Sequence, residues 1–154
     1  MSVTFTLASA AIIAGITLSS TTTLAVISGI NDGTVNESEG IETMFNDCAL
    51  LQETLLAHSC GVKVLSENEI IVQTDCGNMR YVRQNAAEAF KLELGDISNP
   101  EKFFDNLKLF EVDYGRNVQA YTYNHVRENM TDGMAVQNEE ILEDDTIVLT
   151  INVE

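Results

Sequence analysis

The sequence TFTLASAAIIAGITLSSTTTLAVISGI, from Thr4 to Ile30, contains no charged side chain and decides how the rest of the chain is interpreted. A helix over this length would reach ~40 Å at ~1.5 Å of rise per residue, which exceeds the ~30 Å hydrocarbon core of a bilayer. We therefore expect a helix that crosses a membrane once and anchors the chain in lipid. Its many Ser and Thr hydroxyl groups weaken insertion relative to Leu or Ile.

Small residues recur at every fourth position within this segment, at Ala11, Gly15, Ser19 and Thr23. In a helix this spacing places them on one stripe, where two backbones can approach closely, as they do between membrane helices. The pattern predicts self-association, and therefore a homo-oligomer.

Other interpretations of the same residues stay open. A cleaved secretion signal needs a basic start, but no Lys or Arg precedes Asp32. A buried element of a soluble fold is the stronger rival, either as a core helix or as two strands at Val3–Leu7 and Leu24–Ile27. The uncharged segment could also be buried between the chains of a soluble cytoplasmic assembly.

The composition sets limits on the partners of the chain. The first 30 residues aside, about 120 of the 154 residues are left, enough for one domain with its own core. The formal charge of −16 comes from 24 acidic and 8 basic residues. Such a surface repels phosphate backbones and anionic lipid headgroups, so we expect no nucleic-acid partner. Basic proteins or cations are the expected partners.

Two features of the sequence bear on the location of the domain. The first basic residue is Lys63, so basic residues close to the segment do not fix its orientation. The three cysteines, Cys48, Cys60 and Cys76, are an odd number, which fits a reducing compartment better than a set of disulfides. We expect a single-pass membrane protein with its domain in the cytoplasm.

The remaining sequence predicts an α+β domain over residues 41–154, joined to the first 30 residues by an acidic linker at 31–40. Helical spacing of apolar residues predicts a helix from Glu42 to Cys60. Polar turns separate three short predicted strands, which form a meander. These strands lie at 62–65, 69–74 and 79–82.

The sequence of the second half of the domain predicts two helices and two strands. Ala86–Leu94 is compatible with either helix or strand. Ser98-Asn99-Pro100-Glu101 is typical of a helix start, and a further helix is predicted from Arg116 to Met130. The chain ends in alternating strands at Ala135–Leu142 and Thr146–Val153. The expected fold is a small antiparallel sheet packed with two or three helices.

The last third of the chain resembles a known family. Val118–Glu154 contains the helix segment Tyr121-Thr122-Tyr123-Asn124, then Gly133, an acidic strand and a final Thr-Ile-Val-Leu strand. This run is similar to the C-terminal part of an uncharacterised plastid and cyanobacterial open-reading-frame family, a bacterial domain of unknown function. The resemblance implies a small α+β fold without an established activity, and a partner among the AAA-type ATPases. The long uncharged start departs from that family.

The chemical candidates are few. Cys48, His58, Cys60 and Cys76 are zinc-ligand types, but no Cys-x-x-Cys pair is present, so we expect no metal. A third hypothesis is a small enzyme or metal protein that uses Cys60, Cys76 and His125. No glycine-rich phosphate loop occurs, and we expect no cofactor.

An acidic cluster near the C-terminus is the predicted interaction surface. It comprises Glu139, Glu140, Glu143, Asp144 and Asp145, and an alternative interpretation is a solvated hairpin whose charges deter aggregation. The sequence thus favours a non-enzymatic, membrane-anchored adaptor that presents an acidic domain to a protein partner. The first alternative is a soluble, self-assembling structural subunit.

Overall fold

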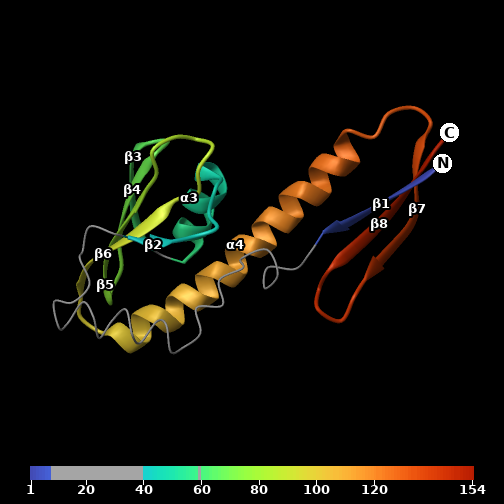
Figure 1. The fold of residues 1–154 in the computed structure, drawn as a ribbon. Coiled ribbons are helices and arrows are strands. Elements are labelled where there is room, and N and C mark those ends of the chain that lie inside the picture. Colours follow the sequence, from blue (N-terminus) through green and yellow to red (C-terminus); the bar gives the residue numbers. More distant parts are fainter. Residues whose placement is uncertain (8–39, 59) are drawn as a thin grey trace.

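The structure is a computed structural model that describes residues 1–7, 40–58 and 60–154. Within these ranges, two antiparallel sheets lie along one long helix, α4 (Pro100–Glu128). Figure 1 shows the larger sheet beside the first half of α4 and the smaller sheet beside its second half. The α+β class is confirmed, with two sheets where the sequence led us to expect one.

The larger sheet has five strands in the order β2-β6-β5-β4-β3. The strands are β2 (Ile41–Glu42), β3 (Gly61–Ser66), β4 (Glu69–Gln73), β5 (Gly77–Val82) and β6 (Lys91–Ile97). The predicted meander is confirmed as β3, β4 and β5. Of the ambiguous stretch Ala86–Leu94, only Lys91–Leu94 is a strand, as the first part of β6, and residues 86–90 are turn and irregular structure.

Helix α3 (Cys48–Ala57) packs against this sheet and begins later than predicted. The side chain of Asp47 caps it by accepting a hydrogen bond from the backbone N–H of Leu50 at 2.9 Å. The helix predicted from Glu42 is wrong for its first residues, because Ile41 and Glu42 pair with β6 instead.

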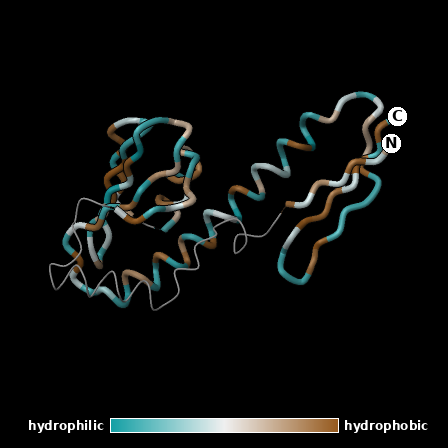
Figure 2. Tube along the Cα trace, viewed as in Figure 1, coloured by the Kyte–Doolittle hydropathy of each residue, from teal (hydrophilic) through white to brown (hydrophobic). Residues whose placement is uncertain are grey.

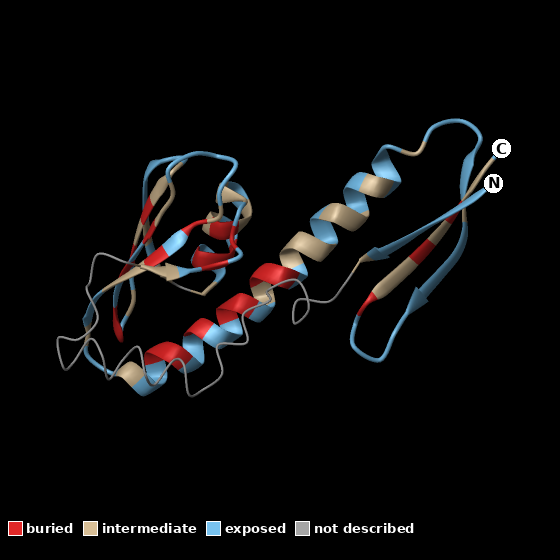
Figure 3. Cartoon of the chain, viewed as in Figure 1, coloured by how far each residue is buried: buried red, intermediate tan, exposed pale blue. Residues whose placement is uncertain are grey.

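An aromatic cluster fixes α4 to the larger sheet. The ring of Phe45 makes edge contacts with Tyr81, Phe110 and Tyr114 at centroid distances of 5.8, 5.3 and 4.6 Å. The hydroxyl of Tyr114 also accepts hydrogen bonds from the backbone N–H groups that precede α3. Figure 3 shows the consequence: buried residues gather in this sheet, in α3 and in the first half of α4.

Helix α4 is continuous where two helices were predicted. Its start is as expected, with Asn99 as the cap and Pro100 in the first turn. The separate helix predicted from Arg116 is wrong, because Gly115 lies inside the helix and is buried there. A glycine inside a helix costs only ~1 kcal/mol, which the packing of the flanking turns offsets.

The smaller sheet joins the two ends of the chain. Its order is β1-β8-β7, formed by β1 (Ser2–Leu7), β7 (Met134–Ile141) and β8 (Ile147–Val153). Strand β1 pairs with β8 from Ser2↔Asn152 to Leu7↔Ile147 without a break. Both strands predicted at the C-terminus are confirmed.

The N-terminal prediction needs correction. The helix predicted from Thr4 to Ile30 is wrong over Thr4–Leu7, because alternating threonines and apolar residues form a strand there. The alternative of a strand at Val3–Leu7 is confirmed. The rest of the segment, with the small-residue stripe Ala11, Gly15, Ser19 and Thr23, lies outside the described residues, as does the linker up to residue 39.

The apolar side of the smaller sheet faces α4. Leu149 and Ile151 of β8 are buried on it, and the amide of Gln119 donates to the backbone oxygens of Leu7 and Asp145 at 3.0 and 2.8 Å. Figure 2 shows the turn between β7 and β8 as hydrophilic. No helix in the described ranges is both long and apolar enough to cross a membrane.

One carboxyl group is buried in α4. Glu111 is 8 % exposed, and burial raises its pKa to about 7, with Lys108 acting in the opposite direction. A buried carboxyl group prefers its neutral form because a charge loses hydration there. The folded state therefore favours protonated Glu111.

Substitution of Gly77 tests how closely β5 approaches β6. A Cβ atom at Gly77 would lie 3.0 Å from the backbone oxygen of Asp96, so Gly77→Ala should lower the unfolding free energy by about 1–3 kcal/mol. Gly61→Ala is the matched control, since its Cβ would meet Gln73 at an ordinary 3.5 Å. Equal denaturation midpoints for the two variants would contradict this packing.

Glu111→Gln tests the buried carboxyl group. Because its folded pKa is raised, Glu111 stabilises the fold below its unfolded pKa, and this contribution is lost as pH rises through about 7. At pH 8 the unfolding free energy of the variant should exceed that of the native chain by at most about 3 kcal/mol. At pH 5 the difference should be small. Urea unfolding at both pH values measures this, with the exposed Glu128→Gln as control. Parallel pH profiles for native and Glu111→Gln chains would refute it.

Candidate functional site

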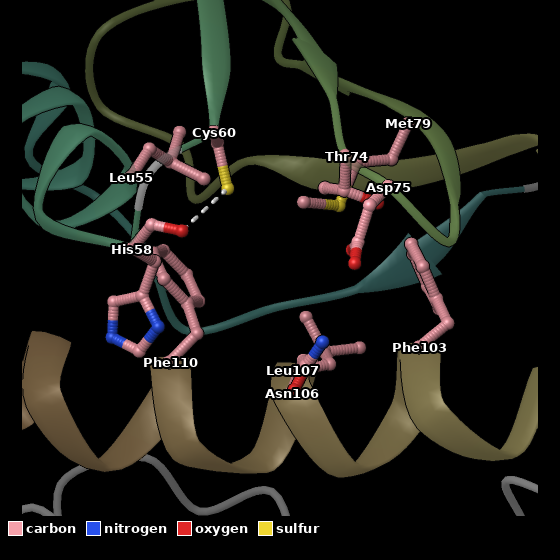
Figure 4. Close-up of a pocket in the computed structure, with 10 residues that line it drawn as sticks. All are labelled: Leu55, His58, Cys60, Thr74, Asp75, Met79, Phe103, Asn106, Leu107 and Phe110. Carbon is pink, nitrogen blue, oxygen red and sulfur yellow. Dashed lines mark hydrogen bonds between the residues drawn. The ribbon is translucent and has the colours of Figure 1, made fainter.

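A hollow of about 460 Å³ lies between the end of α3, the turn from β4 to β5, and the first half of α4. Figure 4 shows its side chains converging from these three elements. Its apolar lining consists of Leu55, Met79, Phe103, Leu107 and Phe110. Its polar lining consists of His58, Cys60, Thr74, Asp75 and Asn106. This volume is in the range of small-molecule and side-chain pockets.

The turn that forms one wall is held by Thr74. Its hydroxyl donates to the backbone oxygen of Gly77 at 2.7 Å and accepts from the N–H groups of Cys76 and Gly77. The backbone oxygen of Cys76 in turn accepts from Ser98, just before α4. The wall is therefore fixed to the start of the helix that forms the floor.

Asp75 places a negative charge at the rim. Its side chain is 69 % exposed, and Lys102 of α4 approaches its carboxylate at 2.6 Å. Hydrogen bonds from the Cys76 thiol and from Lys102 lower the pKa of Asp75. The carboxylate is thus ionised at neutral pH and points toward α4 in Figure 4.

Neither Cys60 nor its neighbour across the turn, Cys76, has the lowered pKa of a nucleophilic thiol. Burial, and then the charge of Asp75, raises the pKa of Cys60, whose Sγ atom is 3.8 Å from the backbone oxygen of His58. The hydrogen bond from Cys76 to Asp75, together with burial, raises the pKa of Cys76. A nucleophilic cysteine needs the opposite shift, because its thiolate is the reactive form.

His58 is bound to the helix rather than to a thiol. Its Nε2 atom lies 2.8 Å from a carboxylate oxygen of Asp113, and its ring packs edge-on against Phe110. This contact joins the end of α3 to the middle of α4. It closes one end of the hollow and orients the ring.

The other candidate metal-ligating or catalytic residues lie outside the hollow. Cys48 packs against the core at the start of α3. His125 stacks on Tyr121 in the outer half of α4, roughly 22 Å along the helix from Phe110 at ~1.5 Å per residue. Among the described residues, no three His, Cys, Asp or Glu side chains come together as a metal site would require. The set Cys60, Cys76 and His125 is therefore not brought together.

The predicted acidic surface is partly used inside the molecule. Glu139 accepts a hydrogen bond from the Tyr123 hydroxyl at 2.9 Å and lies 3.9 Å from Arg127. Asp144 accepts from the N–H of Thr146, and hydrogen bonds with this residue lower the pKa of Asp144. Asp145 shapes the turn with a φ of 62°. Glu140 and Glu143 are exposed.

The sequence predicts elements that form the hollow, but it does not predict how they are arranged around it. The helix start at Asn99-Pro100 and a polar turn between the strands at 69–74 and 79–82 were both predicted. The sequence does not predict the polar side chain of Asn106 in this lining, because nothing local in it shows which turn faces which side of α4.

Comparisons with models of protein families, with curated proteins and with solved structures find no match to this chain.

Proposed function

We propose that the chain is a non-enzymatic interaction protein that takes up a basic segment of a protein partner in the hollow beside Asp75. The observation that carries this proposal is an apolar floor on a chain with a net charge of −16, beside the exposed carboxylate of Asp75, whose partner within the chain is Lys102. Such a site suits an apolar side chain flanked by Lys or Arg. The negative field of the chain would draw a basic partner toward it.

The chemistry of the hollow supports binding over catalysis. The thiol pKa values of Cys60 and Cys76 are raised, and the ring of His58 is engaged by Asp113. The apolar residues, by contrast, offer the kind of pocket in which interface anchors are buried. We retain an AAA-type ATPase as the proposed partner class, on the resemblance of Val118–Glu154. Glu140 and Glu143 remain a proposed acidic surface that is separate from the hollow, because the smaller sheet lies beside the second half of α4.

The pairing of β1 with β8 bears on the proposed membrane anchor. A single crossing between residues 8 and 30 would place β1 on one side of a bilayer and the rest of the chain on the other. Yet β1 and β8 pair over six residues. This constraint favours the alternative, a soluble cytoplasmic assembly in which the uncharged segment is buried between chains.

Binding is tested by Asn106→Arg, which places a bulky cation in the hollow. In affinity purification of the full chain followed by quantitative mass spectrometry, this variant should lose the specific partner by about tenfold or more. Asn124→Arg makes the same change on an exposed part of the same helix and should retain it. Retention of the same proteins by both variants would refute the hollow as the site, and recovery of an AAA-type ATPase identifies the partner class.

A carbonate wash tests the anchor. Because β1 and β8 must share one side of a bilayer, we expect the chain in the soluble fraction after washing cell membranes at high pH. A lipid-embedded helix would stay in the pellet. Retention of the full chain in the pellet, with a known peripheral protein released as control, would restore the membrane proposal.

A further inference from the structure

The two sheets have four edge strands, and three of them carry features that deter pairing. Strand β2 has two residues, and β3 contains a register shift between Val64 and Ser66. Strand β7 has a register shift between Val136 and Asn138, followed by two glutamates. Short strands, bulges and charges are the usual protection of exposed sheet edges.

Strand β1 carries none of these features. Its residues, Ser-Val-Thr-Phe-Thr-Leu, include no charge and no proline, and it pairs with β8 in unbroken register. No described residue pairs with its outer edge. Val3 and Phe5 are also 38 % and 39 % exposed, although they lie on the apolar side of the sheet. An edge of this kind is ready to accept another strand.

The outward-facing backbone groups of β1 can be assigned. Met1 exchanges both backbone hydrogen bonds with Val153, at 2.9 and 2.7 Å. Hydrogen-bonded and non-hydrogen-bonded pairs alternate along antiparallel strands, so Val3, Phe5 and Leu7 also bond toward β8. The N–H and C=O groups of Ser2, Thr4 and Thr6 therefore point to the outer edge.

We propose that β1 pairs with β1 of a second copy of this chain, antiparallel and centred on Thr4. In this register Thr4 faces Thr4 of the second copy, Ser2 faces Thr6, and Val3 faces Phe5. The three residues with outward backbone groups thus meet one another and exchange hydrogen bonds. The polar and apolar sides also continue across the junction.

The self-complementary register is the reason for a second copy as the occupant. A two-fold axis at Thr4 makes the contact isologous, so the assembly closes as a dimer with a continuous six-stranded sheet. Two chains of net charge −16 repel each other, and β1 offers an edge without a charged side chain at which they can approach.

Sedimentation velocity of the full chain over a wide concentration range tests the dimer. Thr4→Lys places two like charges opposite each other at the axis, so the dissociation constant should rise by about tenfold. Asn138→Lys is the matched control, because it lies in the same cross-strand row at the other edge and should leave the dimer intact. A native chain that stays monomeric, or equal dimer stability of the two variants, would overturn the proposal.

Two further measurements guard against a folding defect. Thr4→Pro removes only an outward N–H, which edge strands tolerate, and should weaken the dimer while the melting temperature of the monomer is kept. Amide exchange at Thr4 and Thr6 should slow as the concentration of native chain rises. Protection of these amides in a monomer would show that another part of the same chain covers the edge, and would also overturn the proposal.

Discussion

The pairing of β1 with β8 is the constraint on which the rest of the structure depends. It brings the first residues of the chain to the last ones and completes a sheet whose apolar side packs on the outer half of α4. The contact from Gln119 to both Leu7 and Asp145 fixes this sheet to the helix. It also requires both ends of the chain to lie on one side of any membrane.

Helix α4 connects the smaller sheet to the candidate site. Its outer half carries the smaller sheet, and its first half provides the floor of the hollow and the aromatic contacts to Phe45. Contacts at both ends fix the position of the hollow, from Ser98 before the helix to His58 opposite Asp113. The proposed partner site and the proposed dimer edge on β1 therefore lie beside opposite halves of α4, which allows both to be occupied at once.

The local patterns predicted most of the elements. The cap and proline at Asn99-Pro100, the meander of β3 to β5 and the final hairpin all follow from short-range propensities. Two errors have a common cause. The helix predicted from Thr4 and the break predicted before Arg116 concern residues whose conformation is decided by distant partners, β8 for the first and the packed core around Gly115 for the second. The hollow escaped prediction for the same reason, since its walls are far apart in sequence.

The most direct test of this account is an NMR measurement of cross-strand contacts in the full chain. Non-hydrogen-bonded antiparallel pairs bring their Hα atoms close together, so nuclear Overhauser effects should join Thr4 to Thr150 and Thr6 to Val148. Observation of both would establish the register that joins the two ends of the chain. Their absence, with helical sequential contacts over Thr4–Leu7, would contradict the account and return the N-terminus to a separate helix.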